Sequence, residues 1–532
     1  MKRLIAWARQ QKRLGKLKQA FLVYTWCRQT ERNILGWWRR NVTRVIYQGK
    51  VALRPNWENG HYFLGEELQI RYALLSSKDP IDARKITDIS NRAIAHYRQV
   101  LEINPTRLKA YENLMSILAE LGRMAEASIV LQQSEDVKRN LAEACQEDRL
   151  GIRLVPTRIA TSVGFFANLD CYVKAGLLGW RQPHKIIMLL PDEVTVSNRC
   201  LLEYWGKYIT VITDAETIQT LSPLAKHLED PINYALTRND QAFFMSAGYV
   251  MAHKQWDSEQ RPPLLTLSNT DYERGWQCLE GLGVPKNSWF VCLHVREPGF
   301  KDRGSKFDSY RNANIDTYLL AIETIVAHGG WVIRMGDPSM KPLPAMDRVI
   351  DYVHTDARSD WMDVFLSSQC RFFIATSSGL GVIPVIFGVP MVQTNYLPWG
   401  IFWSKNQDLF LPRLLWSINE KRHLTFSEIL LSPLSWGISQ TFYNNAGVEM
   451  LHNTPDEINE IVLEMLMRLD GQLTYSVTDE RLQERIRSLT EVCNSSLGAK
   501  HLALNCRIGK DFLRKYEALV EPEAELEIMK PG

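Results

Sequence analysis

Short apolar runs alternate with amphipathic stretches over most of the chain after about residue 150. Residues 184–191 (HKIIMLLP) have the pattern of a buried strand, residues 197–208 that of a helix, and residues 209–212 that of a second strand. A further amphipathic stretch at 241–254 predicts another helix. Strands that alternate with helices in this way predict a parallel sheet covered by helices on both faces.

A second set of the same kind begins at about residue 289. It predicts strands at 289–295, 331–335, 349–353, 371–375 and 391–394, and helices at 314–328, 359–368 and 380–387. Ser359 is a suitable N-cap for the second of these helices. A last helix is predicted to begin at Pro455, because Thr454 and Glu457 have capping-box spacing with proline at the first helical position. Two successive α/β sets predict two Rossmann-like domains that face each other.

The region before these two sets is predicted to be helical and carries a short internal repeat. Ala93 and Tyr97 align with Ala127 and Leu131 at an offset of 34 residues. This period resembles that of a tetratricopeptide repeat, in which each helix pair buries its apolar face against a neighbour. The chain has one full repeat and part of another, which favours a region that packs on the rest of the protein, with peptide binding as the alternative.

The length of 532 residues predicts about three domains at roughly 100–200 residues each. The predicted fold class is α/β, a pair of Rossmann-like domains preceded by an all-α region. The predicted divisions are a basic amphipathic helical segment at 1–50, a helical repeat region at 51–148, an N-terminal Rossmann-like domain at 149–272, a C-terminal Rossmann-like domain at 273–472, and a helical tail at 473–532.

Charge is distributed unevenly along the chain. Residues 1–50 hold 13 of the 63 basic residues and one of the 60 acidic residues, Glu31, which leaves 50 basic and 59 acidic side chains in the remainder. The basic segment also contains large apolar residues such as Trp7, Phe21 and Trp37. This pattern fits an anionic membrane surface, and it fits equally a helix that packs on the protein body or binds a protein partner. Nucleic acid binding is disfavoured, because no known binding motif accompanies the charge.

The compartment predicted from the sequence is the cytoplasm, with peripheral association at the inner face of the membrane as an open alternative. No apolar run approaches the roughly 18–20 residues that span a bilayer. Charged residues interrupt the N-terminus where a signal peptide would need an apolar core. The nine cysteines have no CxxC pair or metal-ligand spacing, which is typical of thiols in a reducing compartment.

Candidate binding residues follow the predicted strands of the second set. In open parallel sheets, ligands bind beyond the carboxyl ends of the strands. Arg296 follows the first strand, and its planar fork suits a phosphate group unless a nearby acid pairs with it. Arg334, Gly336 and Asp337 end the next strand, where the Gly-Asp pair either approaches a ligand closely or only forms a turn.

Two further strand ends carry small polar residues. Ser377, Ser378 and Gly379 stand directly before a predicted helix, where backbone amides can face an anion, although a serine there can simply cap the helix. Thr394 and Asn395 end the following strand. Four strand ends of this character predict a pocket for a nucleotide diphosphate.

The polar loop 305–314 (SKFDSYRNAN) follows the first strand of the second set. Its candidate substrate contacts are Lys306, Asp308, Tyr310, Arg311 and Asn312, and the loop could close over a donor. The alternative is an ordinary solvated loop.

The sequence from residue 292 to 395 resembles a bacterial family of predicted glycosyltransferases with tetratricopeptide repeats. The resemblance is carried by CLHVREPGF (292–300), GGWVIRMGDPSM (329–340) and ATSSGLGVIPVIFGVPMVQTN (375–395), and by NTPDEINEIVLEMLMRLDG (453–471). The LHVR strand and the later SSG turn are also similar to the donor sites of fucosyltransferases of the GT-B class. The resemblance is looser in the first Rossmann-like half, where residues 162–165 (SVGF) stand in place of an expected glycine-histidine pair.

The resemblance implies a GT-B-like fold, with the acceptor bound by 149–272 and a nucleotide-sugar donor by 273–472. It implies that Arg296, Ser377, Ser378 and Gly379 bind the donor diphosphate. Asp360 and Trp361 would shape the helix beside the base or ribose, although Asp360 can equally be a first-turn acid stabilised by the helix dipole.

The predicted function is sugar transfer from a nucleotide-diphosphate sugar to an acceptor such as a cell-surface glycan or a lipid-linked precursor. No cofactor or metal is expected, because no DxD motif stands at a strand end and GT-B sites stabilise the leaving group with fixed cations and helix N-termini. An inverting reaction needs a general base, for which His294, Glu297, Asp308 and Asp170 are candidates. The alternatives are a non-catalytic scaffold with a degenerate Rossmann pair, and a sugar-nucleotide epimerase or hydrolase.

Overall fold

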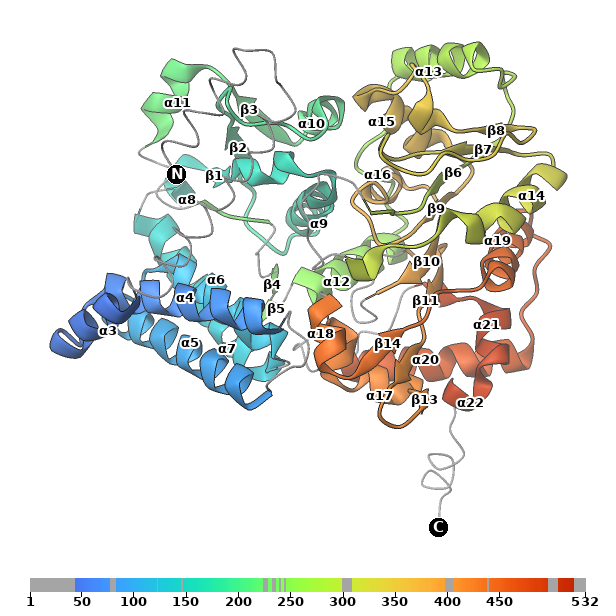
Figure 1. The fold of residues 1–532 in the computed structure, drawn as a ribbon. Helices are drawn as coiled ribbons and strands as arrows, with labels where there is room; N and C mark the ends of the chain where they lie inside the picture. The colour runs from blue at the N-terminus through green and yellow to red at the C-terminus, as the bar shows by residue number, and fades with distance from the viewer. Residues whose placement is uncertain are drawn as a thin grey trace, which may run out of the picture. The chain divides into compact units, whose positions relative to one another are not determined.

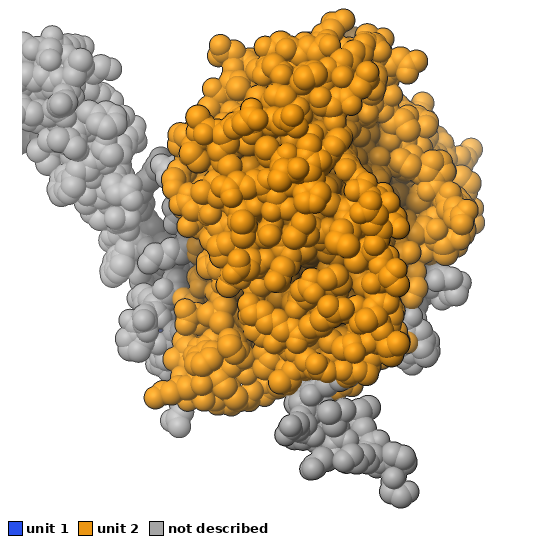
Figure 2. Space-filling model, turned by 90° about the vertical axis from the view of Figure 1, so that its right-hand side faces the viewer, with its two compact units in different colours: residues 1–117 blue, residues 118–532 orange. Residues whose placement is uncertain are grey.

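The structure of the protein is a computed structural model with two compact units, Met1–Ile117 and Leu118–Gly532. It describes residues 44–76, 83–121, 123–144, 147–222, 228–231, 236–238, 241–243, 245–298, 309–397, 405–437, 440–495 and 506–520. The second unit is orange in Figure 2, and each unit is described by itself.

The described part of the first unit is helical. Its helices are α3 (Arg44–Leu53), α4 (Glu58–Ser76), α5 (Ala83–Ile103) and α6 (Leu108–Glu120), the last of which continues past the unit border. Ala93 and Tyr97 are fully buried, and a methyl group on Gly65 would lie 2.8 Å from the Tyr97 ring, so a residue without a side chain lets α4 approach α5 closely. The helical character agrees with the sequence, whereas the tetratricopeptide assignment and the membrane or partner role of 1–50 stay predictions. Residues 1–43 lie outside the described part.

The second unit begins with two helices and a small parallel sheet. The elements are α7 (Met124–Ala144), α8 (Glu147–Leu150), β1 (Ile152–Val155), α9 (Phe166–Leu177), β2 (Lys185–Leu189), α10 (Arg199–Trp205), β3 (Ile209–Ile212) and α11 (Ala215–Leu221). The sheet has the order β1-β2-β3, and both neighbouring pairs are parallel, as the sequence predicts for β2 and β3. The sequence did not predict β1 or α9. The predicted helix at 241–254 was wrong at its start, because β5 (Gln241–Phe243) pairs with β4 (Leu236–Arg238) before α12 (Met245–Ser258) begins.

A seven-stranded parallel sheet forms the larger part of the second unit. Its strands are β6 (Phe290–His294), β7 (Trp331–Arg334), β8 (Val349–Ile350), β9 (Phe373–Ala375), β10 (Met391–Tyr396), β11 (Leu409–Pro412) and β15 (Arg507–Ile508). The order is β15-β11-β10-β9-β6-β7-β8. All the neighbouring pairs are parallel.

Helices cover both faces of this sheet (Figure 1). Val291 and Leu293 pack in the core with α14 (Leu319–Ala327) and α19 (Pro455–Leu469), and Phe290 and Cys292 pack in the core with α13 (Asn269–Gly281) and α15 (Asp360–Gln369). Successive strand side chains point to opposite faces, so a strand buried on both faces must be apolar throughout. This is why apolar runs predicted β6, β7, β8, β9 and β10, although β8 is shorter than the predicted 349–353. The sequence did not predict β11.

The strand order places a switch point between β6 and β9. In chain order the first six strands lie as 3-2-1-4-5-6, because the chain moves outward from β6 through β7 to β8 and then returns to the other side of β6. This is the doubly wound arrangement, in which ligands bind beyond the carboxyl ends of the two strands at the reversal. The fold therefore points to the residues that follow β6 and β9.

Two helices of the second set, α15 and α19, begin where their caps predict. The helix predicted at 314–328 is a 3-10 turn, Ile315–Tyr318, followed by α14. The Ser359 side chain accepts from the Met362 amide at the start of α15. Thr454 and Glu457 form both hydrogen bonds of a capping box at the start of α19. The predicted helix at 380–387 is α16 (Val382–Phe387), which follows the turn after β9.

The last part of the chain adds a small antiparallel sheet and returns to the large one. The antiparallel sheet has the order β13-β12-β14, with β12 (Leu415–Ser417), β13 (Arg422–His423) and β14 (Val448–Met450). The predicted helical tail contains α20 (Val477–Ser495), α21 (Lys510–Lys515) and α22 (Glu517–Val520). It also contains β15, which pairs with β11 and which the sequence did not predict.

The two α/β halves of the second unit share one apolar core. Phe166 and Trp205 from the first half pack in the same buried cluster as Val364, Ile383 and Phe387 from the second. The boundary predicted between residues 272 and 273 falls inside α13. The halves are thus joined by continuous packing of α9 and α10 against α15 and α16.

Two observations bear on the predicted compartment. No helix in the described part of the chain is both long and apolar enough to cross a membrane. The cysteines that fall within the described ranges are free thiols. The cytoplasmic location and the peripheral membrane association stay predictions.

Candidate functional site

The end of β6 and the turn after β9 lie against each other. The Thr376 amide donates to the His294 carbonyl at 3.2 Å, and the Arg296 amide donates to the Thr376 hydroxyl at 2.9 Å. This follows from the parallel pairing of β6 with β9, which brings both carboxyl ends to one edge of the sheet. His294, Arg296, Ser377, Ser378 and Gly379 are called the β6–β9 corner below.

Arg296 is half-buried, and its guanidinium is held by the loop that follows β6. It donates to the Asn312 side-chain oxygen, and the Arg296 carbonyl accepts from the Ala313 amide at 2.9 Å. Arg311 ends the 3-10 turn before Asn312 and is also half-buried. The structure thus brings three predicted donor-binding residues together beside the corner. Asp308 lies outside the described residues.

Arg413, which was not predicted, supports this loop. It is almost fully buried after β11 and donates to the carbonyls of Tyr310, at 2.9 Å, and of Asn312. Burial lowers the pKa of Arg413 to about 10. The sequence signal was available, because Arg413 follows a buried apolar strand just as Arg296 does.

His294 is buried at the end of β6 with a partner on each ring nitrogen. Nδ1 lies 3.1 Å from the Met335 carbonyl oxygen, and Nε2 lies 2.7 Å from the Ser378 hydroxyl. The pKa of His294 is lowered to about 4, mainly by burial and also by the neighbouring Arg334 and Arg296 charges, while the hydrogen bond to Met335 opposes the shift. The imidazole is therefore neutral near pH 7.

We expect His294 to make the protein less stable as the pH falls from about 6.5 to about 4. The unfolded chain binds a proton on this side chain below about pH 6.5, whereas the folded chain binds it only below about pH 4, so its stabilising contribution is complete above the first value. Urea unfolding across this range should show a weaker pH dependence in His294→Gln than in the unchanged protein. His96 and His452, with pKa values also lowered to about 4 by burial, remain in both proteins. Equal slopes would contradict the assignment.

Gly336 lies against the imidazole, and Asp337 forms a turn. Gly336 has a φ of 147°, and a methyl group there would lie 2.4 Å from the Met340 sulfur and 3.3 Å from His294 Nδ1. The position therefore requires glycine. The Asp337 carboxylate accepts from the Ser339 amide at 3.0 Å, which is the turn-forming alternative considered for this Gly-Asp pair.

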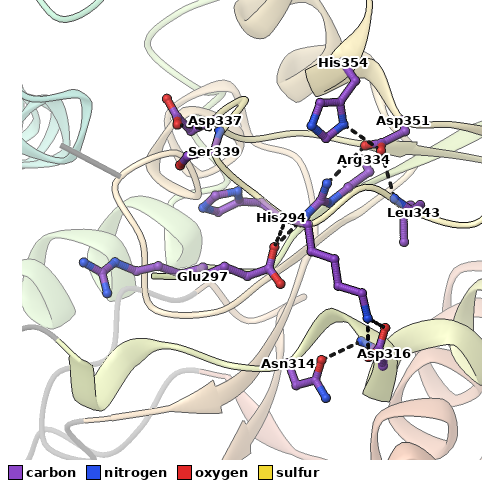
Figure 3. Close-up of polar contacts among 12 residues, drawn as sticks. His294, Glu297, Asn314, Asp316, Arg334, Asp337, Ser339, Leu343, Asp351 and His354 are labelled. Carbon is purple, nitrogen blue, oxygen red and sulfur yellow. Dashed lines mark hydrogen bonds and ion pairs between the residues drawn. The ribbon is translucent and has the colours of Figure 1, made fainter. Parts of the chain in front are cut away.

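Glu297 and Arg334 belong to a network of ion pairs and hydrogen bonds (Figure 3). Arg334 has no exposed side-chain surface and lies 2.8 Å from Glu297 and 3.2 Å from Asp351. Glu297 also accepts from the Lys341 amide at 3.1 Å, and Asp351 contacts His354 at 2.8 Å. A carboxylate held by a guanidinium and an amide is committed to those donors. Glu297 was predicted as a base and Arg334 as a donor contact, and both side chains are instead engaged with each other.

Thr394 and Asn395 are buried and join β10 to the helices beside it. The Thr394 hydroxyl lies 2.6 Å from that of Tyr318, and the Asn395 side-chain amide donates to Tyr318 at 3.0 Å. Asn395, with a φ of 50°, also exchanges backbone-to-side-chain hydrogen bonds of 2.5 and 2.9 Å with Asn453. These contacts fix the end of β10 beside the start of α19, and they leave both residues without exposed surface for a donor.

Asp360 and Trp361 stand at the start of α15 and contact the helices next to it. The Asp360 carboxylate accepts from the Arg199 amide at 3.0 Å, and its carbonyl accepts from the Asn198 side chain at 2.9 Å. The Arg274 guanidinium lies 3.8 Å from the centre of the Trp361 ring. These contacts join α15 to α10 and α13. A role beside the base or ribose stays a prediction for both residues.

Asp170, another base candidate, is buried in α9 with a cation. Its carboxylate lies 2.7 Å from the Lys174 ammonium and 3.8 Å from His253. Burial raises the pKa of Asp170, and the Lys174 charge opposes this effect. Asp170 is only 1% exposed, so its carboxylate is shielded from solvent.

Gly164, from the first half of the unit, contacts Gly379 of the β6–β9 corner. The sequence did not predict this contact. A methyl group on Gly379 would lie 3.0 Å from the backbone nitrogen of Gly164, and one on Gly164 would lie 3.3 Å from the Gly379 Cα. Residues 162–165 thus pack backbone to backbone on the turn after β9. Nothing in the sequence pairs these two distant glycines.

We expect Gly379→Ala to lower the free energy of unfolding by about 1–3 kcal/mol, because its methyl group would press on backbone that cannot move without separating the two segments. Urea unfolding measures the change. Gly281→Ala is the matched control, since a methyl group there meets nothing within 4 Å, and a small gain in stability of up to about 1 kcal/mol is expected in a helix. Equal effects of the two changes would show that the close approach does not constrain residue 379.

No group of three or more His, Cys, Asp and Glu side chains suited to a metal ion occurs within the described ranges. The described residues of the β6–β9 corner offer cationic, hydroxyl and amide groups instead. The expectation of a metal-free site stays a prediction.

No protein-family model matches the chain, and no curated protein matches it. Among solved structures, the chain is similar to a family 9 glycosyl transferase from Veillonella parvula, with 10% identity, 49% of this chain and 85% of the other covered, and a TM-score of 0.31. It is similar to ADP-heptose LPS heptosyltransferase II of E. coli, with 11% identity, 60% and 99% covered, and a TM-score of 0.33. It is similar to a mutant O-GlcNAc transferase of Thermobaculum terrenum, with 11% identity, 99% and 98% covered, and a TM-score of 0.21. These neighbours are glycosyltransferases, but scores this low carry no argument about this chain.

Proposed function

We propose that the protein is a glycosyltransferase with a GT-B-like pair of Rossmann-like halves, and that the β6–β9 corner holds the diphosphate of a nucleotide-sugar donor. One observation carries the proposal: Arg296 and the turn at 376–379 lie side by side at the switch point of the doubly wound sheet. The donor is a nucleotide-diphosphate sugar, and the acceptor hydroxyl belongs to a glycan or a lipid-linked precursor.

The chemistry of the corner suits a diphosphate leaving group. When the sugar–phosphate bond breaks, negative charge develops on the diphosphate oxygens. The Arg296 guanidinium can donate two parallel hydrogen bonds to them, and its position is fixed in advance by Asn312. Donors held in place before the reaction stabilise this charge without reorganising, so a divalent cation is not required in the proposal.

Three of the four candidates for the general base are engaged by partners within the protein. The His294 lone pair is engaged by Ser378, Glu297 pairs with Arg334, and Asp170 pairs with Lys174. Asp308, which follows β6 in the sequence, stays a prediction as the base.

We propose that residues 1–50 bring the protein to an anionic membrane surface or a protein partner near a lipid-linked acceptor.

A thermal-shift screen with GDP-, UDP-, dTDP- and CMP-sugars tests the proposed function. At least one of the first three should raise the melting temperature, and CMP-sugars should not, because they lack the second phosphate that Arg296 is proposed to bind. Product analysis with and without acceptor then separates transfer from hydrolysis or epimerisation of the donor. If none of the diphosphate sugars shifts the melting temperature, the proposed function is wrong.

A further inference from the structure

We propose that the Ser378 hydroxyl binds a hydroxyl group of the transferred sugar and does not bind the diphosphate. The inference rests on the proposed function and adds to it a residue that selects the sugar. It gives the Ser378 hydroxyl a role separate from the backbone amides at 377–379, which are the groups predicted to face the diphosphate.

The His294 tautomer follows from its two partners. The Met335 carbonyl oxygen, 3.1 Å from Nδ1, can only accept a hydrogen bond, so Nδ1 carries the proton. Nε2 of the neutral ring then presents a lone pair to Ser378 at 2.7 Å. The Ser378 hydroxyl must therefore donate its single proton to His294.

The other protonation states are unfavourable at this position. A proton on Nε2 alone would leave the Nδ1 lone pair facing the Met335 carbonyl oxygen. A doubly protonated ring would be a buried cation close to the Arg334 and Arg296 charges. The arrangement with Ser378 as the donor is the one that satisfies every atom.

With its proton committed, the Ser378 oxygen can only accept from a ligand. Its other partner within the described residues is the Leu380 amide, at a long distance of 3.4 Å, and a hydroxyl oxygen has two lone pairs. Ser378 is half-buried and so is not sealed into the core. The inference takes the remaining lone pair of its oxygen to be the one that meets the ligand. A phosphate oxygen that has lost its proton is itself an acceptor and would be repelled there, whereas a sugar hydroxyl can donate.

The position of Ser378 fits this role. It stands one residue before Gly379 and two residues after Thr376, which contacts the Arg296 amide. A diphosphate held by Arg296 would carry its sugar on the terminal phosphate, so the sugar would lie next to this turn. The backbone amides at 377–379 remain suited to the phosphate oxygens.

The test compares binding of each nucleotide sugar with binding of its own nucleoside diphosphate. Full-length protein is titrated calorimetrically with UDP-glucose and UDP, GDP-mannose and GDP, and dTDP-glucose and dTDP. For the pair that binds, Ser378→Ala should reduce the advantage of the sugar nucleotide about threefold to tenfold and leave the nucleoside diphosphate affinity unchanged. Ser377→Ala, the matched control, keeps the backbone amide of residue 377 and should leave the advantage of the sugar nucleotide unchanged.

An unchanged ratio in Ser378→Ala overturns the inference, and so does an equal loss for both ligands. If the unchanged protein binds none of the nucleoside diphosphates or their sugars, the proposed function fails, and the inference fails with it. The two failures are thus distinguishable in one series of titrations.

A second measurement does not depend on any ligand. Nitrogen NMR of the full-length protein labelled at histidine, with the His294 signal assigned by its loss in His294→Gln, reports the tautomer directly. A neutral ring with the proton on Nδ1 at pH 7 supports the inference. A proton on Nε2 overturns it, because the Ser378 hydroxyl would then be free to donate to phosphate.

Discussion

Arg296→Ala should reduce kcat/KM for sugar transfer at least about 100-fold while the protein stays folded. The side chain is half-buried at the end of β6 and is held by Asn312, beside the turn after β9. Removing it deletes the fixed positive charge proposed to stabilise the leaving diphosphate. Initial rates of transfer and urea unfolding of the same preparations measure the two parts of this prediction.

Two further variants show whether the effect is specific to the Arg296 guanidinium. Arg296→Lys keeps the charge but loses the planar fork, so its rate should lie between those of the alanine variant and the unchanged protein. Arg487→Ala removes a partly exposed arginine paired with the exposed Glu484 on α20 and should transfer sugar at the normal rate. Near-normal transfer by Arg296→Ala would remove Arg296 from the donor site.

Arg334→Leu should lower the free energy of unfolding by about 3–5 kcal/mol, the largest change in stability that we expect from one substitution in this site. The guanidinium has no exposed surface and pairs with both Glu297 and Asp351. Leucine removes the cation and leaves two carboxylates in partly buried positions without it. The reason is the unpaired charge that remains, and not the intrinsic strength of the ion pair. Chemical unfolding at neutral pH measures the loss.

Arg481→Ala is the matched control for this change. Its partner is Glu517, and both side chains are about half exposed, at 44% and 48%. Water screens such a pair, so the expected loss is about 0–1 kcal/mol. If Arg334→Leu loses no more stability than Arg481→Ala, the ion network does not stabilise the fold. Arg334 would then again be a candidate for contact with the donor.

Most strands of the large sheet could be predicted because a buried strand needs a run of apolar residues, which is visible in the sequence. A strand covered on both faces, such as β6 or β9, contains a continuous apolar run, residues 290–293 in β6 and 373–375 in β9, and the polar residues that follow the run mark the carboxyl edge. Capping residues placed α15 and α19 for a similar reason, since the Ser359 and Thr454 side chains satisfy amides of their own first turns. Arg296 and Ser378 were therefore placed together from sequence and topology rules alone.

The remaining features depend on contacts between residues distant in the chain. A strand-end arginine looks the same whether it faces a ligand or a buried acid, and only the fold gives Arg334 the partners Glu297 and Asp351. The packing of Gly164 on Gly379 and the pairing of β15 with β11 join segments far apart in sequence. No local pattern specifies which partner is chosen, so these contacts required the structure.

The most direct test is an experimental structure of the protein with the nucleoside diphosphate that binds most tightly. The account predicts diphosphate oxygens within hydrogen-bonding distance, about 2.7–3.2 Å, of the Arg296 guanidinium and of backbone amides at 377–379. A diphosphate bound elsewhere, with the Arg296 guanidinium turned away from it, would contradict the assignment of the site.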